Sequence, residues 1–335
     1  EGGAMTRSRR GRGPGVKESL RLASIDIGTN SIRLLVAGCD GEKTETLDRR
    51  MVITRLGEGV DETHFLSAAA MERTAVTLSD YRSAMDRLEP AGVRAVATSA
   101  LRDSRNKDEF LDSAYKVIGR KPDILSGADE ARASFIGAVS DIDLDGMDEA
   151  GPILVFDIGG GSTEIIVGDH EGIVARSVDV GCVRMSERFL TADPPSPVTV
   201  GRMESHIVGV LKPVISEILP PGVSLAVGLA GTVTTLSAMK QGLEVYDTDR
   251  IHHSRLSRAE VQGLFVKPAS VDVEERKRVM GIEPGRADVI VGGTAVLLAI
   301  MDLVGIDEVL VSEKDILDGL VIDLYRQMVG GTEGE

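Results

Sequence analysis

A repeated unit constrains the fold of this chain more than any other feature of its sequence. A strand-like apolar run, an Asp-Ile-Gly turn and a second apolar run occur at 22–37 and again at 153–167. The aspartates of the two turns, Asp26 and Asp157, are 131 positions apart (157 − 26), which is about the length of one small domain. The repeat therefore predicts two similar lobes in one chain.

Strand-like and helical patterns alternate around the two copies. Helical periodicity is clear at 67–88 and 128–139, and a short buried strand is indicated at 93–98. This alternation predicts an α/β fold in which each lobe holds a mixed sheet covered by helices on both faces. The acidic, glycine-containing stretch 141–151 shows no periodicity and indicates a lobe boundary. We expect a disordered basic tail at 1–20, a first lobe at 21–140 plus about 306–330, and a second lobe at 141–305.

Later signals complete the alternation. Helices are expected at 199–219, where Pro213 indicates a kink or break, and at 286–304. A strand is expected at 308–311. The run from Ser312 to Asp315 has the pattern of a capping box, which predicts the start of a last helix.

Composition excludes several classes of protein. The 335 residues include 3% aromatics and no Trp, and the net charge is −15, so neither base stacking nor counterion release favours nucleic-acid binding. The longest apolar stretch, Val289 to Met301, is shorter than the roughly 20 residues that a bilayer requires. The cysteines, Cys39 and Cys182, are expected to be buried thiols of a cytoplasmic protein without membrane partners.

The paired turns have the chemistry of a phosphate site. Glycines let backbone N–H groups converge on an anion, and nearby hydroxyl, amide and guanidinium groups add donors. A carboxylate repels phosphate, so the aspartates imply an intervening divalent cation. Hairpin turns with aspartate as a turn former are the alternative. The expected phosphate-binding residues in these turns are Gly28, Thr29, Asn30, Ser31, Arg33, Gly159, Gly160, Gly161, Ser162 and Thr163.

Six ordered motifs carry a resemblance to a known family over about Ser24 to Leu320. They read SIDIGTNSIRLLVA, ATSALRD, SGADEAR, VFDIGGGSTEIIVG, VGLAGTVTTLSA and VSEKDILDGL. Together they resemble the exopolyphosphatase / guanosine pentaphosphate phosphatase (Ppx/GppA) family of the actin-like ATPase superfamily. The resemblance implies two RNase H-like lobes with phosphate bound in the interlobe cleft. It also implies the short form of the family, without the helical C-terminal domains of longer members.

Three side chains have expected catalytic roles, and the resemblance implies those of Glu130 and Glu164. Glu130, in SGADEAR, is at the position of the family's catalytic base, and a carboxylate there can orient water for in-line attack on phosphorus. Glu164 is expected to be a metal ligand or second catalytic carboxylate, with an exposed hairpin charge as the alternative. Arg102 is expected to neutralise transition-state charge, or else to pair with Asp103 or cap a helix. The expected metal ligands are Asp26, Asp157 and Glu164.

Two further groups have open interpretations. Gly231 and Thr232 begin a helix, whose N-terminus can bind phosphate, although an ordinary helix start is the alternative. The residues His252, His253, Arg255, Arg276 to Arg278 and Arg286 form either a basic path for a long anion or a solvated surface. Without a nearby third ligand, the two histidines predict no metal site.

These residues, with the resemblance, predict an exopolyphosphatase that releases orthophosphate from inorganic polyphosphate with Mg²⁺ or Mn²⁺ as cofactor. The alternatives are hydrolysis of guanosine pentaphosphate (pppGpp), an actin-like ATPase or kinase, and a nonenzymatic protein that binds polyphosphate or an alarmone. A homodimer is a possible assembly.

Overall fold

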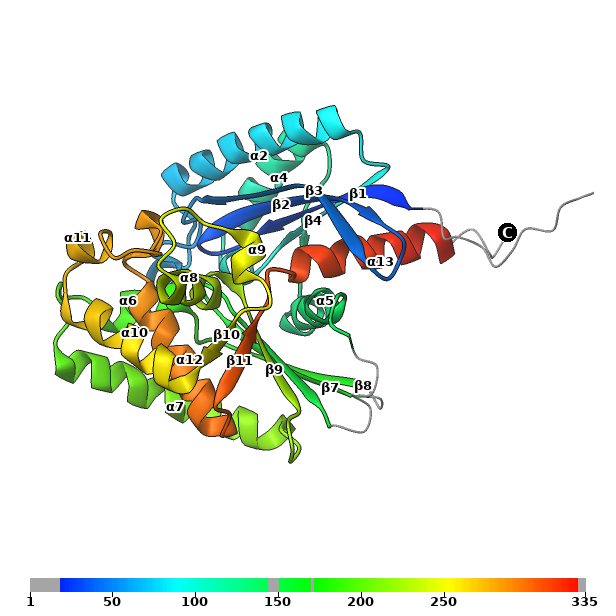
Figure 1. The fold of residues 1–335 in the computed structure, drawn as a ribbon. Helices are drawn as coiled ribbons and strands as arrows, with labels where there is room; N and C mark the ends of the chain where they lie inside the picture. The colour runs from blue at the N-terminus through cyan, green and yellow to red at the C-terminus, as the bar shows by residue number, and fades with distance from the viewer. Residues whose placement is uncertain (1–18, 144–150, 170–171, 331–335) are drawn as a thin grey trace, which may run out of the picture.

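The computed structural model describes residues 19–143, 151–169 and 172–330, which form two mixed sheets and the helices around them (Figure 1). Most of the expected basic tail and of the expected boundary loop lies outside these residues. The first sheet contains β1 (Leu20–Ile27), β2 (Ser31–Cys39), β3 (Thr44–Ile53), β4 (Gly92–Ala97) and β5 (Asp123–Ile124). The second sheet contains β6 (Ile153–Ile158), β7 (Thr163–Asp169), β8 (Gly172–Val178), β9 (Leu225–Leu229), β10 (Arg255–Ser257) and β11 (Glu308–Val311).

The two sheets repeat one topology. The strand order is β3-β2-β1-β4-β5 in the first sheet and β8-β7-β6-β9-β11-β10 in the second. In each sheet the first three strands along the chain pair antiparallel in sequence order. β4 and β5 run parallel to β1, and β9 and β11 run parallel to β6, whereas the edge strand β10 is antiparallel to β11. The predicted repeat is therefore confirmed, and it extends to a third strand in each lobe that the sequence analysis missed. β3 was not recognised because most of its side chains are partly or fully exposed.

Helices cover both faces of each sheet. The outer face of the first sheet packs on α2 (Ala68–Leu88) and α4 (Lys107–Ile118). The outer face of the second packs on α7 (Pro197–Ile218), α8 (Ala230–Gln241), α10 (Arg258–Ser270) and α12 (Ile290–Val304). The shorter helices are α1 (Val60–Thr63), α3 (Ser99–Arg102), α6 (Cys182–Phe189), α9 (Thr248–Ile251), α11 (Val273–Arg276) and the 3₁₀ turn η2 (Pro284–Arg286). No helix among the described residues has the length and apolar character to cross a membrane.

Some predicted boundaries are corrected by the structure. The helix expected from 286 begins at Ile290, because η2 precedes it, and α7 continues through Pro213 without a break. β11 pairs with β9, so this strand belongs to the second sheet. The expected boundary at about 306 had placed it in the first lobe. The capping residue of the last helix is Asp315 instead of Ser312, since its Oδ1 accepts the Leu317 N–H at 3.0 Å.

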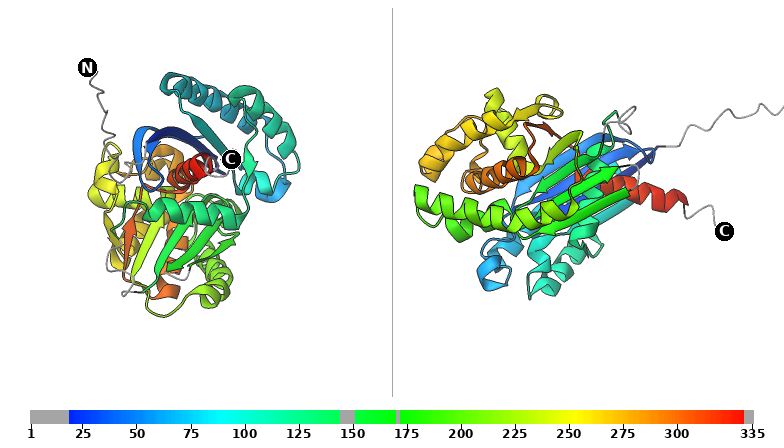
Figure 2. Two further views of the ribbon diagram at one scale, coloured as in Figure 1. Left: turned by 90° about the vertical axis from the view of Figure 1, so that its right-hand side faces the viewer. Right: turned by 90° about the horizontal axis from the view of Figure 1, so that it is seen from below.

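Two helices lie between the sheets, α5 (Gly127–Val139) and α13 (Ile316–Gly330), as Figure 1 and the left view of Figure 2 show. They cross at glycines. A Cβ on Gly319 would lie 1.9 Å from the Ala133 carbonyl oxygen, and one on Gly137 would lie 1.8 Å from that of Asp315. Backbone is in contact with backbone at this crossing, so no side chain can move aside to make room.

We expect Gly319→Ala to lower the free energy of unfolding by about 3 kcal/mol, because the added methyl group must push α5 and α13 apart. Denaturant unfolding followed by circular dichroism measures this change. Gly209→Ala is the matched control, since Gly209 lies on α7 with nothing within 4 Å of an added Cβ. It is expected to raise stability by about 0.5–1 kcal/mol. Equal stability of the two variants would contradict the packing described here.

Candidate active site

The two Asp-Ile-Gly turns meet between the lobes. A Cβ on Gly160 would lie 2.9 Å from Thr29 Cβ, and one on Gly161 would lie 2.6 Å from Ser99 Oγ, so the second turn is in direct contact with the first lobe. Beside this contact is a cavity of about 70 Å³, which we call the catalytic cavity. It is lined by Asp26, Gly28, Thr29, Asn30, Ser31, Arg33, Thr98, Ser99, Glu130, Asp157, Ile158, Gly159, Gly160, Ser162, Cys182, Ala230, Gly231, Arg286 and Ile316.

The turns repeat each other in their hydrogen bonds as well as in sequence. Gly28 N–H donates to the Ser31 carbonyl, and Gly159 N–H donates to the Ser162 carbonyl, both at 3.0 Å. They are therefore hairpin turns, as the alternative interpretation proposed, and they also line the cavity. The Asn30 carbonyl accepts the N–H groups of Thr54 and Arg55, which ties the first turn to the chain after β3.

The aspartates at the ends of β1 and β6 are almost completely buried. Arg33 donates to Asp26 Oδ2 through Nε at 3.0 Å and through Nη2 at 2.6 Å, and its Nη1 donates to Asp315. The guanidinium of Arg33 thus bridges two carboxylates. Ser134 Oγ donates to Asp157 Oδ2 at 3.0 Å. Burial raises the pKa of Asp26, and burial with the charge of Asp315 raises the pKa of Asp157 to about 6.

Glu130 faces the cavity from the first turn of α5, which begins at the N-cap Ser126. Arg102 Nη1 donates to Glu130 Oε2 at 2.6 Å and to the Leu125 carbonyl at 3.0 Å, so Arg102 pairs with Glu130 and not with Asp103. Burial raises the pKa of Glu130 to about 7, and the Arg102 charge offsets only part of that effect. A carboxyl group with this pKa can accept a proton near neutral pH.

Glu164 is buried behind the cavity instead of lining it. Its Oε1 accepts hydrogen bonds from Ser162 Oγ at 2.9 Å and from Ser177 Oγ at 2.6 Å, and the residue is 1% exposed. The alternative of an exposed hairpin charge is therefore wrong. Burial and the charges of Glu130 and Asp157 raise the pKa of Glu164 well above its usual value.

Besides Arg102, which pairs with Glu130, three other predicted residues also lie off the cavity lining. Gly161 packs against Ser99, Thr163 Oγ1 donates to the Val180 carbonyl, and Thr232 packs against Gly293 within the second lobe. Gly231 does line the cavity, and the guanidinium of Arg286 lies directly over it. From the sequence, Arg286 was expected only as one of a loose basic group, because its approach to Gly231 depends on the packing of η2 on α8.

The chain matches the model of the Ppx/GppA phosphatase family over residues 35–328. This protein belongs to the Ppx/GppA phosphatase family. Exopolyphosphatase 2 of Mycobacterium tuberculosis is 39% identical over 91% of this chain and 98% of its own. The guanosine-5'-triphosphate,3'-diphosphate pyrophosphatase of Vibrio parahaemolyticus is 30% identical over 91% of this chain and 59% of its own.

Solved structures agree with this assignment. The Aquifex aeolicus Ppx/GppA family member is 30% identical, covers 93% of this chain and 99% of its own, and superposes with a TM-score of 0.76. An exopolyphosphatase from Cytophaga hutchinsonii is 27% identical with a TM-score of 0.82, over 92% of this chain and 98% of its own. The predicted fold class, two RNase H-like α/β lobes with a cleft between them, is confirmed.

The charge balance of this family member's cavity suits a divalent cation. Of the residues that line the cavity, Asp26, Glu130 and Asp157 carry carboxyl groups, and Arg33 and Arg286 carry guanidinium groups. Asp315 and Glu164 add buried carboxyl groups beside it. Asp26 Oδ1 is buried and has no hydrogen-bond partner. In the described part of the chain, however, Asp26, Asp157 and Glu164 do not bring one oxygen each within 4.8 Å of the others. The two aspartates fit a cation, directly or through water, whereas Glu164 is held by its serines.

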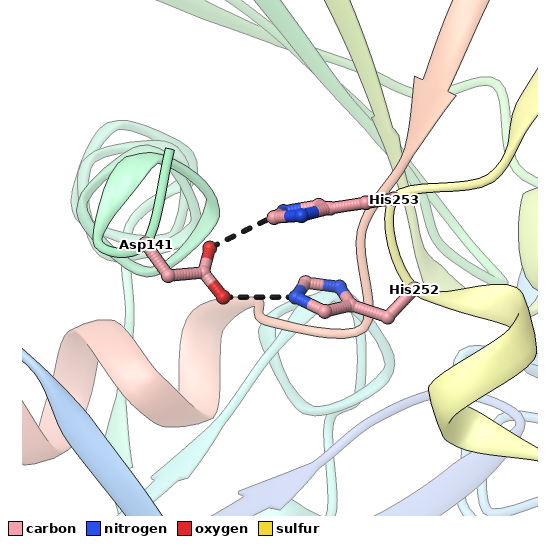
Figure 3. A group of neighbouring side chains, drawn as sticks. All are labelled: Asp141, His252 and His253. Atoms are coloured by element: carbon pink, nitrogen blue, oxygen red, sulfur yellow. Dashed lines mark hydrogen bonds and ion pairs between the residues drawn. The ribbon is translucent and has the colours of Figure 1, made fainter. Parts of the chain in front are cut away.

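One group of described residues does bring three ligand atoms within 4.8 Å of one another: Asp141, His252 and His253 (Figure 3). It is a possible metal-binding group by composition, and Asp141 is the partner that the sequence analysis lacked. Glu313 N–H donates to His252 Nδ1 at 3.1 Å, which leaves the imidazole proton on Nε2, 2.8 Å from Asp141 Oδ2. One hydrogen bond, from His252, and a 3.4 Å contact between His253 Nε2 and Asp141 Oδ1 thus already join the group.

The expected basic path is largely absent. His252 and His253 contact Asp141, Arg255 pairs with Glu308 at 2.6 Å, and Arg276 is 2% exposed with its guanidinium bonded to backbone carbonyls. Arg276 is therefore neither part of a path nor solvated surface. Of this predicted set, Arg286 alone lines the catalytic cavity, and it also lines a neighbouring cavity of about 530 Å³.

Proposed function

We propose that this protein is an exopolyphosphatase that hydrolyses the terminal phosphoanhydride of inorganic polyphosphate and releases orthophosphate. One observation carries the proposal: Glu130, with a pKa of about 7, faces a cavity lined by the backbone of both glycine turns. The 39% identity to a protein named exopolyphosphatase 2 supports the same substrate.

In the proposed reaction, the turns that contain Gly28 and Gly159 bind the terminal phosphate through backbone N–H groups. Glu130 orients a water molecule and accepts its proton as the water oxygen bonds to the terminal phosphorus. The bond from phosphorus to the bridging oxygen then breaks, and the shortened chain leaves. Arg102 holds the Glu130 carboxylate in place through their 2.6 Å contact. No covalent enzyme intermediate is required.

The proposed cofactor is Mg²⁺ or Mn²⁺, held by Asp26 and Asp157. When bound, such an ion neutralises charge on the phosphate oxygens. Asp26 Oδ1 is buried and has no hydrogen-bond partner, so it is the first atom that we expect to bind the cation. Glu164 lies behind Ser162, whose hydroxyl donates to its Oε1, so we assign it no direct contact with the ion. We also propose a cytoplasmic location, which the two buried free thiols support, and a homodimer, which light scattering tests.

The rest of the polyphosphate chain is proposed to extend into the 530 Å³ cavity. Arg33 and Arg286 line both cavities, and Arg49 and Arg50 add guanidinium groups to the larger one, which Glu244, Glu283, Glu313 and Asp315 also line. A second substrate is favoured by the other half of this cavity, where Leu243, Ile282 and Tyr246 offer apolar and aromatic surface. A bare phosphate chain has no apolar group to pack against such surface, whereas the guanine base of pppGpp can pack against it.

Phosphate release from defined-length polyphosphate and from pppGpp, with and without Mg²⁺, tests these proposals. We expect metal-dependent release from polyphosphate, with one orthophosphate for each chain unit lost. Faster release from pppGpp would favour the second substrate and assign the larger cavity to the nucleoside. Turnover of neither substrate would contradict the proposed hydrolase and favour a binding protein. ATP-dependent phosphoryl transfer without polyphosphate cleavage would instead favour a kinase.

A further inference from the structure

The guanidinium of Arg184 lies between the lobes and divides its donors among three segments of the chain. Nε donates to the Gly161 carbonyl at 2.8 Å, Nη2 donates to Asp103 Oδ2 at 2.6 Å, and Nη1 donates to Asp61. The side chain is only 12% exposed. Because the guanidinium is planar and its donors point in fixed directions, these three bonds define the relative positions of the three segments.

Each partner of Arg184 belongs to a different part of the protein. Gly161 is in the second glycine turn, whose residues 159, 160 and 162 line the catalytic cavity. Asp103 directly follows Arg102, which binds Glu130 at 2.6 Å. Asp61 is on α1 of the first lobe. One side chain from the second lobe is thus bonded to the proposed phosphate cradle and to the segment that holds the proposed base.

Arg184 is itself fixed to the second turn. It is on the first turn of α6, and its backbone N–H donates to the Gly160 carbonyl at 3.1 Å. Burial alone would lower the pKa of Arg184, but the bond to Asp103 and the charge of Asp61 raise it, so the group stays cationic. Burial would likewise raise the pKa of Asp61, yet the bonds and charges of Arg188 and Arg184 hold it below its usual value.

We propose that Arg184 is a positioning residue for hydrolysis, which sets the distance between the phosphate cradle and Glu130. The inference rests on the proposed function. The contacts of Arg184 with Asp61 and Asp103 join the second lobe to the first. These contacts therefore form when the lobes are together and break when the lobes part. Arg184 therefore couples lobe closure to the placement of the base relative to the bound phosphate.

Kinetics of Arg184→Met test the proposal, since methionine preserves much of the apolar length and removes every donor. We expect kcat for polyphosphate to fall about 30-fold while KM changes less than about threefold, because a small misplacement of the base lowers the rate more than it weakens binding. Arg188→Met is the matched control. Arg188 is on the same helix and binds Asp61 at 2.7 Å, but it has no bond to Gly161 or Asp103. It should keep kcat within about twofold.

Chemical rescue separates positioning from a general loss of structure. In Arg184→Ala, added guanidinium ion is expected to restore several-fold activity, because it can reoccupy the same three acceptors. Hydrogen exchange supplies a readout that does not depend on activity, and Arg184→Met should speed amide exchange of a peptide covering 158–163 in the folded protein. If Arg184→Met does not fold, Asp103→Ala replaces it. We then expect kcat to fall while KM again changes less than about threefold.

The proposal is overturned if folded Arg184→Met keeps kcat within about twofold, or if Arg188→Met lowers kcat equally. Unchanged exchange at 158–163 would also overturn it. If the wild-type protein releases no phosphate from polyphosphate or pppGpp, the proposed function fails. The exchange measurement then decides alone whether Arg184 positions the second turn.

Discussion

Glu130→Gln is expected to lower kcat for polyphosphate hydrolysis about a thousandfold, which is within the range for loss of a general base. Glutamine has nearly the same shape and can still contact Arg102, but its amide cannot accept the proton of the attacking water. Binding of polyphosphate should be retained, so KM is expected to change little. Phosphate release measures kcat, and equilibrium binding of a labelled chain measures affinity.

Asp129→Asn is the matched control for this variant. Asp129 is adjacent to Glu130 on α5 but is exposed, and its Oδ2 accepts a hydrogen bond from Ser126 Oγ at 2.6 Å. It should keep kcat within about threefold. A loss of binding in Glu130→Gln that matched its loss of rate would argue for a role in substrate binding and against a role as the base.

The pH profile gives an independent check of the same residue. Burial raises the pKa of Glu130 to about 7, and a base works only when it is unprotonated. The value of kcat/KM should therefore rise about tenfold per pH unit below 7 and level off above it. Because the pKa of the nearby Asp157 is about 6, the measured midpoint reports the two interacting carboxyl groups together and not Glu130 alone. A rate that falls as pH rises through 7 would contradict the proposed base.

Asp157→Asn is expected to lower kcat about a hundredfold and to raise the Mg²⁺ concentration needed for half-maximal activity. The substitution keeps the side chain's size but removes the charge that the proposed cation requires. Titration of phosphate release with Mg²⁺ measures both effects.

Ser134→Ala is the control for Asp157→Asn, because it removes the 3.0 Å hydrogen bond to Asp157 and leaves the carboxylate in place. Its kcat should fall by less than about tenfold, in line with the loss of one hydrogen bond. An unchanged Mg²⁺ requirement in Asp157→Asn would exclude Asp157 as a holder of the ion.

The sequence predicted the repeated parts of the fold well, for a local reason. β1, β6 and β9 are apolar runs of nearly completely buried residues bounded by turn signals, so their boundaries are readable from composition. β3 and β8 were missed because they are partly exposed strands with mixed side chains. Pairing with the neighbouring strand decides their structure, and no local pattern records that pairing.

The paired turns were also readable, because glycine, hydroxyl residues and aspartate must be adjacent in the chain to form such a turn. The sequence by itself thus determined the two lobes and placed a phosphate-type turn in each. What it could not determine was which charges meet. Arg33 was expected to bind phosphate, and only the structure shows that its guanidinium also bridges Asp26 and Asp315, which is 282 positions away.

Only the tertiary structure decided the partners of the remaining charged groups. Arg102 binds Glu130, Glu164 is enclosed by Ser162 and Ser177, and Arg184 joins the two lobes. A turn is formed by residues that are adjacent in the chain, so it can be predicted from the local sequence. An ion pair depends on the distance between side chains carried by different elements, and only the tertiary packing of those elements sets that distance.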